Sequence, residues 1–211
     1  MHETTASGDR PVDQGRRRFT RGGFVAPVVL GSLISKPVLG AGVPYICSIS
    51  GKMSGNTSAP RHRDVHCDEL GRSPGYWKNH TDWVGYQRGD GKCPAPKGTN
   101  FEQAFGVDAF RSHECIVYES SGTYPSGSRP ATMLQVLQAG GGGIKPLGRA
   151  AVASLLNASS PAYSSSYPLT PSEVVRLFKG VYQGGTVQVN GSVYWNSSQV
   201  KDYFESLYGG L

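Results

Sequence analysis

Four cysteines constrain the fold of this 211-residue chain more than any other feature of its sequence: Cys47, Cys67, Cys93 and Cys115. They are even in number and contain no Cys-x-x-Cys pair, which favours two disulfides over a zinc ribbon. Three pairings are open. We expect Cys47–Cys67 and Cys93–Cys115, because each would close a polar loop of about 20 residues and contribute about 3 kcal/mol in the chain-entropy model.

The first 41 residues have the order of regions of an export signal. A basic segment contains Arg16, Arg17 and Phe19, an arrangement that resembles the twin-arginine motif. A weakly apolar, proline-interrupted stretch and then small residues follow it. The alternative is a basic tail before a core helix. We expect residues 1–41 to engage the twin-arginine translocase and to be removed. The mature protein would then reside in the periplasm, at the cell surface or in the extracellular space.

The export segment also carries much of the positive charge. It holds six of the 21 basic residues and three of the 15 acidic ones, so cleavage lowers the net charge from +6 to +3. The remaining chain has no cluster of lysine and arginine, and we expect no nucleic-acid partner. No apolar run reaches the roughly 18–20 residues that a membrane helix needs, so we expect no integral membrane span after cleavage.

The mature part is punctuated by glycine and proline, which number 29 and 14 in the whole chain and predict long loops. Residues 43–58 alternate apolar and small polar residues, which predicts short strands or a hairpin. We therefore divide the mature chain into a strand and loop segment, residues 42–71, and a helical module, residues 72–211.

Helix signals dominate the module. Thr170-Pro171-Ser172-Glu173 is the clearest helix start, because threonine, proline and glutamate occupy the positions that a capping box favours. Asn190-Gly191 predicts a hairpin turn. We expect helices at 99–106, 130–139, 147–157, 170–184 and 197–208, an irregular loop at 107–128 and a hairpin at 186–194. The predicted fold class is mainly α: a small helical bundle with long loops, short N-terminal strands or a hairpin, and disulfide ties.

Residues 72–86 carry the densest group of side chains suited to recognition. A helix through this segment would bring its aromatic and polar side chains together at three- and four-residue steps. The preferred interpretation is that the two indoles are buried in the core and anchor the segment there. A platform that stacks on sugars is the second interpretation, and a histidine acting as a general base is the third. The candidate binding residues are Tyr76, Trp77, Asn79, His80, Asp82 and Trp83. We assign no catalytic residue.

A second group of side chains consists of candidate metal ligands. His62 and His66 are four residues apart, and Asp64, Cys67 and Asp68 lie beside them. On a helix, two such histidines share a face. However, Pro60 precedes the run and Cys67 is expected in a disulfide. We therefore assign no metal and no cofactor.

An ordered series of motifs resembles a family of exported bacterial proteins that carry a "GYWKNH" module. The series consists of Pro74 to His80, Phe101 to Gly106, the Gly140–Gly143 cluster, Leu147 to Ala158, and Tyr167 to Thr170. The resemblance covers residues 72–211. It implies a secreted helical module, often part of large surface proteins, and no established activity. This chain differs in lacking a visible sorting tail after the module.

These observations favour an exported, non-enzymatic module with a structural or ligand-binding role. A carbohydrate or another envelope component is the expected partner. Two alternatives stay open. One is a secreted hydrolase or metal-dependent enzyme centred on His80 and Asp82. The other is a subunit that associates with itself into a surface layer or filament.

Overall fold

The computed structural model describes residues 45–54 and 66–209, and all of them belong to one compact unit that spans Ile34–Leu211. The helical segments are η1 (Tyr45–Cys47), α1 (Ile49–Ser54), η2 (Cys67–Glu69), α2 (Pro74–Asn79), α3 (Phe101–Phe105), α4 (Met133–Gln138), α5 (Lys145–Ser159), α6 (Pro171–Gly184) and α7 (Ser197–Glu205). The strands are β1 (Phe110–His113), β2 (Ile116–Glu119), β3 (Arg129–Pro130), β4 (Thr186–Asn190) and β5 (Val193–Asn196).

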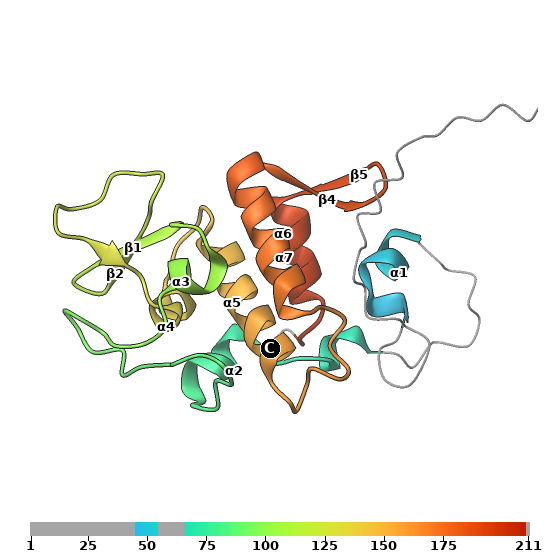
Figure 1. Ribbon diagram of the computed structural model, residues 1–211, viewed down its shortest axis with the longest axis horizontal. Helices are drawn as coiled ribbons and strands as arrows, with labels where there is room; N and C mark the ends of the chain where they lie inside the picture. The colour runs from blue at the N-terminus through green and yellow to red at the C-terminus, as the bar shows by residue number, and fades with distance from the viewer. Residues whose placement is uncertain (1–44, 55–65, 210–211) are drawn as a thin grey trace, which may run out of the picture. The chain divides into compact units, whose positions relative to one another are not determined.

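Helix α5 is the centre of the packing, as its sequence predicts. Eleven of its 15 residues are buried, and it packs against α2, α4, α6 and α7 (Figure 1). Its small residues allow this close approach. A Cβ atom at Gly148 would lie 2.5 Å from Cζ of Phe110, so no larger residue fits there without a shift of the phenyl ring.

The N-terminus of α5 is capped from a distant strand. The Ile144 N–H donates to Oε1 of Glu119 on β2 at 3.0 Å. Gly143 has φ +65°, a backbone conformation that favours glycine. A Cβ at this position would also collide with the Glu119 carboxylate. A negative group at the positive end of a helix stabilises it, so Glu119 joins the small sheet to the central helix.

The C-terminal part agrees with the sequence prediction. Thr170 and Glu173 form the expected capping box at the start of α6. Strands β4 and β5 pair antiparallel as a hairpin (Figure 1), and Gly191 and Ser192 connect them, one residue later than the predicted Asn190-Gly191 turn. Helix α7 follows directly, with Asn196 as its N-cap.

Four phenylalanines form an aromatic cluster within the core. Phe101 and Phe105 lie one turn apart on α3, with ring centroids 4.2 Å apart. Phe110 and Phe178 complete the cluster in mostly edge-on contacts. Phe101 and Phe105 therefore share one face of the helix that was expected at 99–106.

Two predicted segments differ from the structure. Residues 45–54, expected as strand or hairpin, form η1 and α1. Ser48 accepts a hydrogen bond from the Gly51 N–H at 3.1 Å, and the buried Cys47 and Gly51 lie four residues apart, as on a helix face. The alternation of small residues therefore fits the two-residue period of a strand and also the helical period. The hydrogen bond accepted by Ser48 favours the helix.

Residues 107–128, expected as an irregular loop, contain β1 and β2. Each strand has only four residues, too few for a clear alternation in the sequence. Pro130, expected in the first turn of a helix, lies in β3 at the edge of the sheet order β2-β1-β3. An edge position tolerates the missing N–H of proline. Helix α4 begins three residues later, where Thr132 and Gln135 form a capping box.

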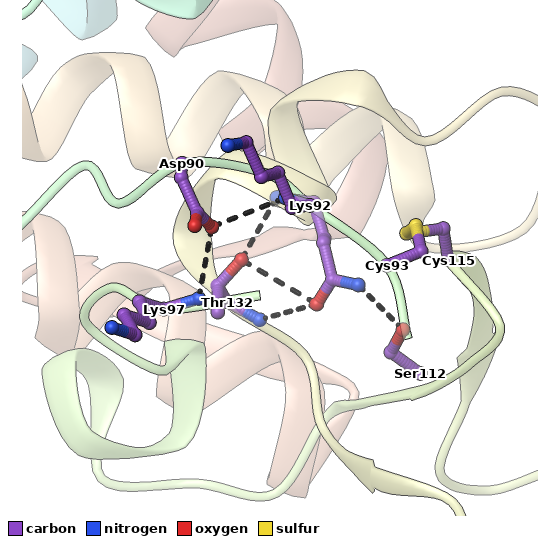
Figure 2. Close-up of a disulfide and its surroundings, with 8 residues drawn as sticks. Asp90, Lys92, Cys93, Lys97, Ser112, Cys115 and Thr132 are labelled. Carbon is purple, nitrogen blue, oxygen red and sulfur yellow. Dashed lines mark hydrogen bonds between the residues drawn. A yellow bond between two sulfur atoms is a disulfide. The ribbon is translucent and has the colours of Figure 1, made fainter. Parts of the chain in front are cut away.

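Helices hold 43% and strands 14% of the described residues, so the fold is mixed rather than a purely helical bundle. The predicted disulfides, Cys47–Cys67 and Cys93–Cys115, are both present, and the second is shown in Figure 2. All four cysteines of the chain are thus paired.

Buried tyrosines make the free energy of unfolding of this core fall at alkaline pH. Burial raises the pKa of Tyr167, and also of Tyr203 and Tyr208. An unfolded tyrosine ionises near pH 10, whereas these side chains stay neutral in the folded protein. The free energy of unfolding is therefore fully retained below about pH 10. Above it, the free energy falls by about 1.4 kcal/mol per pH unit for each such tyrosine.

We expect Tyr167→Phe to remove one of these contributions. Urea unfolding should give a free energy within about 1 kcal/mol of the parent at pH 8. At pH 11 the variant should lose about 1.4 kcal/mol less than the parent does. Tyr194→Phe is the control, because Tyr194 is 56% exposed. If the free energy of unfolding fell equally between pH 8 and pH 11 in the parent and in Tyr167→Phe, Tyr167 would not contribute to the pH dependence.

Candidate functional site

The aromatic segment of the sequence forms the short helix α2 and the turn after it. The Ser73 side chain accepts from the Tyr76 N–H, and Pro74 occupies the first turn. The helix ends at Asn79, earlier than the expected helix through Trp83. Trp83 lies in the turn after the helix and is hydrogen-bonded to it: its indole Nε1–H donates to the Trp77 carbonyl at 3.2 Å.

Asn157 on α5 anchors this segment to the core. Its Oδ1 accepts from Trp77 Nε1–H at 3.0 Å and from the Arg72 N–H at 2.8 Å. Its Nδ2 donates to the Arg72 carbonyl at 3.0 Å. Asn157 is 0% exposed and its bond to the Trp77 indole is buried, while its two bonds to the Arg72 backbone are partly buried. A Cβ at Gly71 would lie 2.5 Å from Nδ2 of Asn157, which explains the glycine beside the anchor.

Both indoles of the segment belong to the core. Trp77 is 2% exposed and Trp83 is 6% exposed. Their rings pack inside the protein, as the core-anchor interpretation expects. They therefore offer no open face for stacking on a sugar ring. Any platform in this region must come from other side chains.

A row of four exposed or half-buried side chains lies over the anchor: Tyr163, Arg72, Tyr76 and His80. We call it the Arg72 row. The guanidinium carbon of Arg72 lies 5.4 Å from the Tyr163 ring centroid and 5.5 Å from that of Tyr76. Arg72 Nε–H also donates to the Tyr163 hydroxyl at 3.0 Å, which lowers the pKa of Tyr163 and raises the pKa of Arg72. Cation–π contacts and this hydrogen bond hold the guanidinium in a fixed orientation.

His80 closes the row at the C-terminal end of α2. Its ring stacks on Tyr76 with centroids 3.6 Å apart, and its Nδ1 lies 2.8 Å from the Tyr76 carbonyl oxygen. A carbonyl oxygen only accepts, so Nδ1 carries the hydrogen and Nε2 is the nitrogen left for another contact. Asp82 is exposed and interacts with Thr81. In the part of the chain that the structure describes, no hydrogen bond joins His80 to Asp82.

A surface groove of about 800 Å³ has Arg72 and Tyr76 of the Arg72 row in its lining. Two carboxylates, a guanidinium, a phenol, an amide and a hydroxyl contribute to its walls, together with glycine backbone. Its lining residues are Asp68, Glu69, Gly71, Arg72, Ser73, Gly75, Tyr76, Asn79 and Gly209. The lining thus offers both hydrogen-bond donors and acceptors.

The structure brings some of the candidate residues together and separates others. Tyr76 and Asn79 line the groove, and His80 stacks on Tyr76. Of the metal hypothesis, His62 and Asp64 lie outside the described residues, as do Arg16, Arg17 and Phe19 of the export segment. His66 is exposed, 3.8 Å from Asp68, and Cys67 is in a disulfide. Residues 45–54 and 66–209 contain no group of three side chains suited to holding a metal ion.

Sequence reasoning missed several residues of the site, among them Glu69, Arg72, Asn157 and Tyr163. Asn157 has a visible signal, because it is an amide in the mostly apolar stretch from Leu147 to Ala158, and a buried amide needs partners. Tyr163 follows α5 in a serine-rich turn. Nothing in its surroundings marks it as a neighbour of Arg72, 91 residues away.

No protein-family model, curated protein or solved structure matches the chain. Within the described residues, no helix has both the length and the hydrophobicity to cross a membrane.

We expect Asn157→Ala to lower the free energy of unfolding by about 3 kcal/mol or more. The substitution leaves the Trp77 indole N–H and both backbone groups of Arg72 without their partner, and each such loss costs about 1–3 kcal/mol. Asn79→Ala is the matched control, because Asn79 is exposed and bonds only to the Gly75 carbonyl of its own helix. Urea denaturation of both variants makes the comparison. A loss below 1 kcal/mol for Asn157→Ala would show that the anchor contributes little.

Proposed function

We propose that the chain is exported by the twin-arginine translocase and acts outside the cytoplasm as a non-catalytic module that binds an envelope carbohydrate. The segment with Arg16, Arg17 and Phe19 supports the export route. The two disulfides fit an oxidising, non-cytoplasmic location. The likeness of residues 72–211 to an exported "GYWKNH" module is part of the same proposal.

The groove that Arg72 and Tyr76 line is the observation that carries the binding part of the proposal. Sugar hydroxyls both donate and accept hydrogen bonds, so they fit a surface whose lining contains both carboxylates and hydrogen-bond donors. Asp68 and Glu69 supply acceptors, and Asn79 supplies an amide at the same wall. The groove is open along its length, which suits a segment of a polymer better than an enclosed small molecule.

The anchor beneath the groove supports binding without large rearrangement. Asn157 fixes the backbone of Arg72 on both sides of the residue, and Tyr163 fixes its guanidinium. A preorganised site loses less conformational entropy when a ligand binds. The groove therefore has the rigidity that a recognition surface needs.

The separation of His80 from Asp82 favours a binding role over the hydrolase alternative. In that alternative, Asp82 would orient His80 as a general base and Nε2 of His80 would face the reacting atom. His80 is oriented by the Tyr76 carbonyl and ring, and Asp82 interacts with Thr81. The two residues on which the enzyme hypothesis depends therefore have separate partners.

We expect the purified exported protein to bind envelope polysaccharide, measured by affinity electrophoresis and isothermal titration calorimetry. Asn79→Ala should weaken binding about tenfold, since it removes about 1–1.5 kcal/mol of hydrogen bonding to the ligand. Its thermal unfolding should match that of the parent. Tyr194→Ala, on the β4–β5 hairpin, is the surface control and should bind like the parent. Parent protein that binds none of the polysaccharide fractions would overturn the proposal, as would equal affinity of Asn79→Ala and the parent.

The export route has its own test. The precursor with Arg16→Lys and Arg17→Lys should accumulate in the cytoplasm, where its four cysteines stay reduced. Counting alkylated thiols by mass spectrometry distinguishes the pools, with four labels for retained protein and none for exported protein. Export of the double variant at the parent's level would exclude the twin-arginine route.

A further inference from the structure

The two disulfides of this protein differ in their access to solvent. Cys47 is 0% exposed, and its carbonyl accepts a hydrogen bond from the Tyr203 hydroxyl at 3.1 Å. Cys93 is exposed, and Cys115 is half-buried. Exchange begins when a thiolate attacks one sulfur of a disulfide, so it requires an accessible sulfur. Cys67, the partner of Cys47, is half-buried like Cys115, so the exposed Cys93 is the cysteine that distinguishes the two disulfides.

Cys115 lies in a constrained turn. Glu114 and Cys115 form the two-residue connection between β1 and β2, with φ values of +48° and +67°. Side chains other than that of glycine adopt this left-handed region at a cost. A two-residue hairpin turn requires positive φ at both residues, so the pairing of β1 with β2 sets this geometry and holds Cys115 in place whether or not the bond to Cys93 is closed.

A small pocket beside Cys115 favours this cysteine as the leaving thiolate. The pocket has a volume of about 170 Å³, and its lining includes Cys115, Gln135, Gln138 and Lys145. An ammonium group near a thiolate lowers the free energy of its charged form, and amide N–H groups add hydrogen-bond donors. Lys145 is also the first residue of α5, at the positive end of that helix.

The surroundings of the bond are held independently of it (Figure 2). The Asp90 carboxylate accepts from the Lys92 N–H at 3.1 Å and from the Lys97 N–H at 3.3 Å, which closes the loop that carries Cys93. On the other side, Gln135 Nε2–H donates to Ser112 at 2.7 Å. Opening the bond therefore changes the structure locally and leaves the core folded.

We infer that Cys93–Cys115 is a thiol-exchange site whose substrate is a small thiol. The incoming thiolate attacks Sγ of Cys93, a new S–S bond joins the two, and the Cys93–Cys115 bond breaks. The electron pair of the broken bond stays on Sγ of Cys115, a residue that lines the same pocket as Lys145. A second thiolate then attacks the mixed disulfide and releases the oxidised small thiol, leaving Cys93 and Cys115 reduced. Two thiols thus supply the two electrons. The inference goes beyond the proposed carbohydrate binding and does not depend on it.

The test uses the full oxidised protein with reduced glutathione at pH 8. Samples are acid-quenched over time and alkylated, and their peptides are mapped by mass spectrometry. We expect glutathione to appear first on Cys93. We also expect Cys93–Cys115 to open at least a hundredfold faster than Cys47–Cys67, with the circular dichroism spectrum retained. Equal opening rates of the two disulfides would overturn the inference, and so would glutathione found mainly on Cys115.

Lys145→Gln tests the leaving group. Raising the pKa of the leaving thiol by one unit slows exchange about threefold, so this variant should exchange about threefold slower than the parent. Lys179→Gln, which removes an exposed lysine of α6, is the control and should leave the rate unchanged. An unchanged rate in Lys145→Gln, in protein with the parent's circular dichroism spectrum, would contradict the assigned role of Cys115.

Discussion

The side chain of Asn157 is the interaction on which the candidate site depends. Its three hydrogen bonds connect the central helix α5 to a segment about 80 residues earlier in the chain. They place the Trp77 indole in the core and fix the backbone of Arg72. The indole fixes helix α2, and Arg72 in turn orders Tyr163 and Tyr76 around its guanidinium. The buried amide of Asn157 thus positions the part of the groove that Arg72 and Tyr76 line.

Single polar side chains connect other distant segments in the same way. Glu119 joins the small sheet to the N-terminus of α5, and Gln135 joins α4 to β1. Asp90 closes the loop that carries Cys93. The chain is rich in glycine and proline and modest in apolar residues, so its loops bury little hydrophobic surface. Side-chain hydrogen bonds and disulfides hold such loops. Where the bond is buried, as at Gln135, an unpaired polar group in its place would be costly.

The sequence predicts those parts of the fold that have local chemical signals. The capping box at Thr170, the β4–β5 hairpin and the pairing of the cysteines each depend on a few neighbouring residues or on loop length. The four-residue strands β1 and β2 are too short to produce a period. Helix α1 depends on Ser48, whose capping competes with an alternation of small residues. Of the site, Tyr76, Asn79 and His80 are visible from their clustering. Tyr163 reaches Arg72 only through the tertiary packing of α5, which no local pattern records.

Hydrogen exchange at the three tryptophan indoles tests the role of Asn157 most directly. In ¹⁵N-labelled protein, each indole N–H gives its own NMR signal, and the chain has only Trp77, Trp83 and Trp195. If Asn157 holds the Trp77 indole in the core, that N–H exchanges only when the protein unfolds globally, at a rate set by the free energy of unfolding. Exchange of the Trp77 N–H at the rate of a solvent-exposed indole, in protein that remains folded, would contradict this account.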